Sequence, residues 1–169
     1  MRGVSSEYPK TLVSAGETAP DFDLPVLIGG VKKRLRLKDE LAHRNIVLAF
    51  YPLNWEAVSA RQVVEYQAEH KNFVAQNAEV AGISVDSIMN TTEWDREIGP
   101  FDFPLCSDFW PHGEVSRSYG VFREHNPNAG ASERAVFVVS RSGKIVFSKV
   151  YGLHELPPLS ETLEALRRL

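Results

Sequence analysis

Sulfur is scarce in this sequence. Among 169 residues there are one cysteine, Cys106, and two methionines. A single thiol excludes an intrachain disulfide, and no cysteine stands at zinc-binding spacing from another ligand. A chain without disulfides fits a reducing compartment, so we expect a cytoplasmic protein.

Long apolar runs and an excess of one charge are also lacking. No apolar run approaches the roughly 18 residues that a membrane span needs. The first residues include Arg2 and Lys10 without an apolar core between them, so they do not resemble a signal peptide. The net charge of −3 gives no general attraction to nucleic acid or anionic lipid. We therefore expect neither a nucleic acid nor a membrane as a partner.

Metal-binding and phosphate-binding motifs are missing as well. None of the five histidines forms a close pair such as H-E-x-x-H. The pair Gly29-Gly30 is not followed by a phosphate-binding glycine motif, and it is typical of a turn. The sequence therefore predicts no metal and no cofactor.

What the sequence does contain is the pattern of one α/β domain. We expect residues 1–15 to form a loosely held N-terminal arm and residues 16–169 a single domain. The apolar runs 45–51 and 80–85 predict strands buried on both faces of a sheet. The basic segment 31–37 predicts an edge strand whose charges face water.

Helical patterns and turn signals separate these strands. Apolar residues recur at helical spacing from 55 to 77, with Val63, Tyr66, His70, Phe73 and Val74 on one stripe. We further expect a helix at 90–98, capped by Asn90 or Thr91, followed by a strand at 103–106 and a helix at 113–119. The segments 134–139 and 144–150 should form a hairpin. A last helix should present one apolar face, made of Leu159, Leu163, Leu166 and Leu169. This order predicts an α/β fold with a mixed central β-sheet flanked by helices.

Several motifs in this order resemble those of the AhpC/TSA peroxiredoxin family, and in particular its one-cysteine AhpE-type subgroup. They are residues 16–22 (GETAPDF), 50–53 (FYPL), 83–87 (ISVDS), 103–113 (FPLCSDFWPHG) and 134–139 (RAVFVV). The resemblance runs from about residue 16 to the C-terminus. It implies a thioredoxin-like fold as peroxiredoxins elaborate it, an antioxidant thiol peroxidase of the alkyl hydroperoxide reductase type, and a homodimer.

The sequence departs from the family at the residues that perform the reaction. The family motif is Pro-x-x-x-Thr-x-x-Cys, and the same spacing here starts at Pro52, with Glu56 in the threonine position and Ser59 in the position of the peroxidatic cysteine. The resemblance assigns the family's catalytic arginine to Arg134 and aims it at position 59. Gln62 stands where the family often has a glutamate.

These changes remove the chemistry of the family. Peroxide reduction needs a thiolate that becomes a sulfenic acid, whereas the hydroxyl of Ser59 stays protonated near neutral pH. We therefore expect a protein without thiol peroxidase activity, retained for binding or regulation, with a small-molecule or peroxide-like ligand in the degenerate pocket. We expect Glu56 to pair with Arg134 and to supply the negative charge of the lost thiolate; the alternative is a first-turn acid that points to solvent.

Two other interpretations stay open. The protein is an active antioxidant thiol peroxidase if Cys106 is a relocated redox centre, or if Ser59 is an engineered replacement of the peroxidatic cysteine. The changes at positions 56 and 62 argue against engineering alone, and the simpler interpretation of Cys106 is a small buried hydrophobe. A third interpretation is a different enzyme that uses Glu56 as an acid or base. We also consider that Trp55 walls off or fills the pocket, and that His112 serves in packing.

Overall fold

Apolar strands form the centre of the sheet in the computed structural model, which describes residues 11–169. The strands β3 (Asn45–Phe50) and β4 (Ala78–Ser84) are parallel and buried, as their continuous apolar sequences predict. β5 (Leu105–Ser107) runs parallel to β4 on one side. On the other side, β6 (Arg134–Val139) pairs antiparallel with β3, and β7 (Ile145–Tyr151) completes the predicted hairpin.

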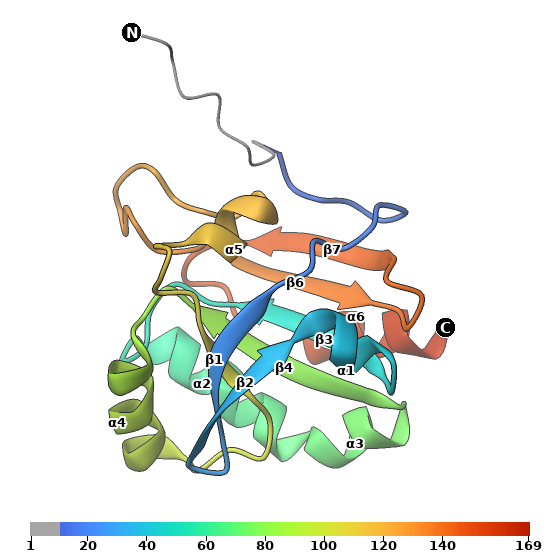
Figure 1. Cartoon of the computed structure of the whole chain (residues 1–169), viewed down its shortest axis with the longest axis horizontal. Coiled ribbons are helices and arrows are strands. Elements are labelled where there is room, and N and C mark those ends of the chain that lie inside the picture. The colour runs from blue at the N-terminus through green and yellow to red at the C-terminus, as the bar shows by residue number, and fades with distance from the viewer. Residues whose placement is uncertain (1–10) are drawn as a thin grey trace, which may run out of the picture.

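The opposite edge of the sheet is a hairpin that the sequence analysis found only in part. β2 (Val31–Arg36) is the expected edge strand, but its partner β1 (Asp23–Ile28) was not predicted. β1 contains Pro25, which has no N–H to donate, and β5 pairs only with the two residues that follow it. The sheet therefore has seven strands in the order β2-β1-β5-β4-β3-β6-β7 (Figure 1).

Helices cover both faces of this mixed sheet, so the predicted α/β architecture is confirmed. One face packs against four helices, which are α2 (Ala57–Ala68), α3 (His70–Ala75), α4 (Ile88–Ile98) and α6 (Leu159–Arg167). Their core contains Tyr66, Trp94 and Leu166. The other face packs against the short helices α1 (Leu37–Leu41) and α5 (Glu114–Ser118), with Leu48 and Tyr119 in its core.

Some predicted boundaries were wrong. The helix expected over 55–77 is two helices, because α2 ends at Ala68 and α3 begins at His70, and Val74 is exposed. Neither Asn90 nor Thr91 caps α4: the helix begins earlier, and the Ser87 hydroxyl accepts from the Asn90 N–H. The helix α1 was not predicted, and Leu169 is exposed rather than packed with the other leucines of α6.

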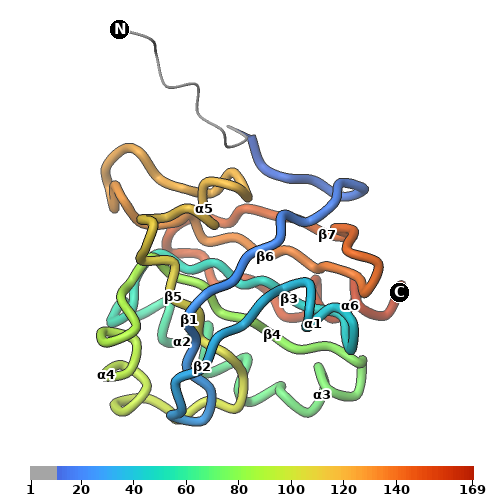
Figure 2. The backbone as a smooth tube through the Cα atoms, in the orientation of Figure 1, coloured from blue at the N-terminus to red at the C-terminus, as the bar shows by residue number. Residues whose placement is uncertain are grey.

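The N-terminal segment packs on the domain from residue 11 onward. Residues 1–10 of the predicted arm lie outside the described residues. Val13, by contrast, is buried and donates its N–H to the Tyr119 carbonyl at 3.2 Å. Gly16 and Ala19 donate to the carbonyls of Ile145 and Gly143 at 2.8 and 2.9 Å, so the chain runs alongside the β6–β7 hairpin (Figure 2). The last part of the arm is therefore held rather than loose.

The sheet register determines which loops meet. β3, β4 and β5 are parallel, so their carboxyl ends lie at one edge of the sheet. β6 runs in the opposite direction and pairs Ala135 with Phe50, which places the start of β6 at the same edge. The loop that leads from β3 into α2 therefore lies beside Arg134.

Within residues 11–169, no helix is long and apolar enough to cross a membrane.

Candidate functional site

The first turn of α2 is capped by a carboxylate. Glu56 is the N-cap residue, with extended backbone angles, and its side chain turns back onto the helix. Its Oε1 accepts from the Val58 N–H at 2.9 Å and its Oε2 accepts from the Ser59 N–H at 2.8 Å. The cap satisfies two of the N–H groups that a helix start leaves without partners, and it sets a negative charge at the positive end of the helix dipole.

Arg134 lies directly against this carboxylate. Its side chain is fully buried at the start of β6, and its Nη2 is 2.9 Å from Glu56 Oε2. Glu56 itself is 22% exposed, so the pair lies at the edge of the interior. The ion pair expected between Glu56 and Arg134 is therefore present, and the solvent-facing alternative for Glu56 is wrong.

Every N–H of the Arg134 guanidinium has an acceptor. A guanidinium has five N–H donors, and one of them bonds Glu56. The other four donate to Ser59 Oγ at 3.2 Å, to Gln62 Oε1 at 2.9 Å, and to the Leu153 carbonyl from Nε at 3.1 Å and from Nη2 at 2.6 Å. Such an arrangement lowers the cost of burying the arginine, because every N–H group that carries its charge has a hydrogen-bond acceptor.

Ser59 is buried between the two charged groups. Its hydroxyl donates to Glu56 Oε2 at 2.7 Å and accepts from Arg134 Nη1. Burial would raise the pKa of Glu56, but hydrogen bonds from Ser59, Val58 and Arg134 outweigh that effect and lower the pKa from 4.5 to about 2. Glu56 is thus a carboxylate at neutral pH and a very weak base, so it does not activate the Ser59 hydroxyl.

A chain of hydrogen bonds extends from Arg134 along the buried face of α2. Gln62 accepts from Arg134 and donates from its Nε2 to the Tyr66 hydroxyl at 3.2 Å. Burial raises the pKa of Tyr66 to about 12. Gln62 was expected only as a departure from the family. Tyr66 and the Leu153 carbonyl were not predicted as groups of the site. Helical spacing of 59, 62 and 66 was an available signal for the side chains, whereas no sequence signal marks a backbone carbonyl.

Pro52 lines a hollow that includes neither Glu56 nor Arg134 in its lining. The residue is buried at the end of β3. The hollow measures about 230 Å³, and its lining includes Pro52, Leu53, Asp86 and His112. Of the four predicted site residues, three are joined by direct hydrogen bonds, and Pro52 has no hydrogen bond to them.

The loop before α2 is fixed by a buried amide. Asn54 donates its N–H to Asp86 Oδ2 at 2.9 Å, and its Nδ2 donates to Asn90 Oδ1 at 3.1 Å and Thr91 Oγ1 at 3.0 Å. These bonds tie the loop to the start of α4. Because Asn54 lies two residues before Glu56, these bonds also fix the backbone that leads into the N-cap of α2.

Trp55 does not fill the site. Its side chain is 54% exposed and donates from Nε1 to Asn90 Oδ1 at 3.1 Å, which directs the ring toward α4. Its φ of 69° lies in the left-handed region, which is uncommon for a bulky residue. The expectation that Trp55 walls off or fills the pocket was therefore wrong.

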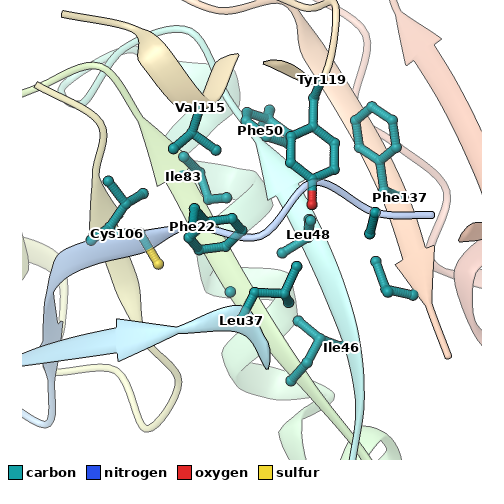
Figure 3. Packing of buried hydrophobic residues seen from close by; sticks show 14 of the residues in the cluster. Phe22, Leu37, Ile46, Leu48, Phe50, Ile83, Cys106, Val115, Tyr119 and Phe137 are labelled. Atoms are coloured by element: carbon teal, nitrogen blue, oxygen red, sulfur yellow. The ribbon is translucent and has the colours of Figure 1, made fainter. Parts of the chain in front are cut away.

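Cys106 is part of the apolar core on the other face of the sheet. The side chain is fully buried in the middle of β5, and Figure 3 shows its sulfur directed into the cluster that contains Phe22 and Leu37. The helix α2 packs against the opposite core. Burial raises the pKa of the Cys106 thiol, with a further contribution from the charge of Asp108. The residue is a small hydrophobe in this fold.

His112 takes part in packing at the rim of the hollow. Its ring meets those of Phe109 and Phe122 edge-on, and its Nε2 is 2.9 Å from the Gly130 carbonyl. The packing role expected for His112 is therefore confirmed. In the part of the chain from 11 to 169, no three His, Cys, Asp or Glu side chains lie close enough together to hold a metal ion.

The fold and this site define a class of protein. A mixed sheet between helical layers, with the first turn of a long helix facing a buried arginine on the neighbouring antiparallel strand, is a thioredoxin-like fold of the peroxiredoxin type. Comparison of the coordinates agrees: the reduced 2-Cys peroxiredoxin of Plasmodium vivax superposes with a TM-score of 0.83 over 92% of this chain and 81% of that chain, at 23% identity. At that identity the likeness concerns the fold alone.

Sequence comparisons assign the family. The AhpC/TSA family matches residues 15–148. Alkyl hydroperoxide reductase E of Mycobacterium tuberculosis is 34% identical over 139 residues, covering 82% of this chain and 86% of the relative. A chloroplastic 2-cysteine peroxiredoxin of Chattonella marina var. antiqua is 32% identical over 163 residues, covering 93% and 80%. The chain belongs to the AhpC/TSA family of peroxiredoxins and alkyl hydroperoxide reductases.

Proposed function

We propose that this member of the family does not reduce peroxides through a thiol and that it acts as a binding or regulatory protein. The observation that supports the proposal is the buried hydroxyl of Ser59 beside Arg134, in the place that the family motif gives to the peroxidatic cysteine. A thiol peroxidase attacks one peroxide oxygen with a thiolate. The O–O bond then breaks, the sulfur becomes a sulfenic acid, and the other oxygen leaves as water or an alcohol. A protonated hydroxyl supports no such step.

The surroundings of the other two candidate groups support the same proposal. The Cys106 thiol is fully buried and its pKa is raised by that burial, so it offers neither the exposure nor the thiolate that peroxide reduction needs. Glu56, with a pKa of about 2, is ionised at neutral pH, so it has no proton to donate and is a poor base. Neither a relocated peroxidase centre nor acid–base catalysis by Glu56 is favoured by this geometry.

We also propose that the protein is a homodimer, with the apolar rim of the hollow as its contact surface. Phe109 and Trp110 are 49% and 78% exposed, and the Phe109 ring meets His112, which lines the hollow together with the exposed Leu53. Large apolar side chains gathered in one exposed area are typical of protein interaction sites.

A gain-of-function series tests the proposed loss of activity. Hydrogen peroxide consumption with dithiothreitol as reductant is measured for the native chain, for Cys106→Ala, for Ser59→Cys, and for Glu56→Thr combined with Ser59→Cys. We expect background rates for the first two. Ser59→Cys alone should gain less than the double variant, because the Glu56 carboxylate would raise the pKa of a thiol at position 59. Turnover by the native chain that disappears in Cys106→Ala would establish the relocated-thiol alternative.

A further inference from the structure

Four donors from three residues converge on the Glu56 carboxylate. They are the N–H groups of Val58 and Ser59, the Ser59 hydroxyl, and Nη2 of Arg134, at 2.7 to 2.9 Å. Helix N–H groups, a hydroxyl and a guanidinium are the donors that proteins use to bind a free oxyanion. The group that occupies this donor set is a side chain of the protein itself.

Arg134 does not depend on Glu56 for its position. Apart from the bond to Glu56, Arg134 donates twice to the Leu153 carbonyl, once to Gln62 and once to Ser59 Oγ, so four of its five N–H groups keep their acceptors without Glu56. The Val58 and Ser59 N–H groups keep their direction whenever the first turn of α2 is formed, although that turn opens more often without its cap. Removal of the Glu56 side chain would therefore leave a preorganised set of donors without an acceptor.

We propose that Glu56 is the built-in ligand of an oxyanion site and keeps that site closed to free anions and peroxides. A carboxylate fixed on the N-cap residue has an effective concentration far above that of a dissolved anion. All five N–H groups of Arg134 already have acceptors, so a second anion has no donor there until Glu56 leaves. Without Glu56, the site takes a small carboxylate such as formate or acetate. This goes beyond the proposed function, and its test measures anion binding rather than peroxide reduction, so the two can fail separately.

Chemical rescue tests the proposal. The melting temperature of Glu56→Ala is measured while sodium formate replaces sodium chloride at constant ionic strength. We expect a rise of about 3–5 °C at formate concentrations near ten times its Kd, and a further rise with the logarithm of the formate concentration above that. The native chain should show no difference between the two salts. In Glu56→Gln the neutral side chain still fills the site, so formate should have no effect there.

Two further variants make the result decisive. If Glu56→Ala does not fold, Glu56→Ser keeps a capping oxygen and leaves room for formate. Glu161→Ala is the matched control for general anion effects, because it removes the carboxylate from the exposed pair with Lys149, 3.0 Å away. A formate response in the native chain, an equal response in Glu161→Ala, or no rise in melting temperature with formate in Glu56→Ala or Glu56→Ser would overturn the proposal.

Discussion

At the scale of single residues, Glu56 has two structural roles at once. It caps α2 through the N–H groups of Val58 and Ser59, and it neutralises a fully buried arginine. Either role is modest on its own, but loss of the carboxylate leaves a buried guanidinium without its counter-charge. Such losses are among the costly single substitutions in proteins.

We therefore expect Glu56→Ala to lower the free energy of unfolding by about 3 kcal/mol. Chemical denaturation of the native and variant proteins measures the difference. Glu161→Ala, which breaks an exposed ion pair, should cost less than about 1 kcal/mol and is the control. Equal effects of the two substitutions would mean that the Glu56–Arg134 pair is no stronger than a surface pair.

The low pKa of Glu56 makes its contribution to stability depend on pH. The folded protein holds this carboxyl at a pKa of about 2, below the ordinary value of 4.5, so between these values the unfolded chain binds more protons. The contribution is complete above about pH 4.5 and is lost as the pH falls toward 2. The difference in unfolding free energy between the native chain and Glu56→Gln should shrink over that window. A difference that stays constant down to pH 2 would contradict the assignment.

At the scale of elements, the site depends on the start of α2 staying formed. The loop before the helix is tied to α4 through Asn54, and the first turn is closed by Glu56 and Arg134. A helix end usually frays, because its first N–H groups lack partners. Here the N–H groups of Val58 and Ser59 bond the Glu56 side chain, and Arg134 of β6 holds that side chain in place.

Hydrogen exchange should detect this closure. In the native chain the amides of Val58 and Ser59 should be protected, and in Glu56→Ala their exchange should become at least about tenfold faster. The amide of Val63, in the buried middle of α2, is the internal control and should change only as far as global stability changes. Exchange at the first turn that is the same in both proteins would show that Glu56 does not hold it.

The elements also show how far the sequence could predict the structure. Continuous apolar runs identified β3 and β4 because strands buried on both faces need them. β1 was missed because it contains Pro25, which usually excludes a strand. The proline is tolerated here because β5 pairs only with Val26 and Leu27, and the sequence alone does not show that pairing. The Glu56–Arg134 pair was predicted because the resemblance to the family places both residues at one site, whereas the Leu153 carbonyl that orients Arg134 comes from a loop whose path the sequence does not specify.

At the scale of the whole molecule, several large exposed apolar residues of the described segment 11–169 lie near the carboxyl ends of the central strands. Phe109 and Trp110 stand two and three residues after the end of β5, and Leu53 stands three residues after the end of β3. The site and the proposed contact surface therefore share one edge of the sheet, and the hollow that includes Pro52 is lined by Leu53 and His112 of that surface.

If that surface joins two copies, the native chain should elute with twice the mass of one chain in size-exclusion chromatography with light scattering. Trp110→Ser should shift the equilibrium toward the monomer, because it removes the most exposed aromatic side chain of the rim. Val74→Ser changes an exposed apolar residue on α3, away from the rim, and should leave the dimer intact. A monomeric native chain at micromolar concentration would contradict the proposed dimer.

The central claim is that an oxygen stands where this family needs a sulfur, inside a site that its own glutamate closes. The second-order rate constant for reduction of hydrogen peroxide by the purified, pre-reduced native chain tests it most directly, measured by competition with a haem peroxidase. The account predicts no reduction beyond the slow reaction of an unactivated, buried thiol. A rate equal to that of alkyl hydroperoxide reductase E of Mycobacterium tuberculosis, measured side by side, would contradict it.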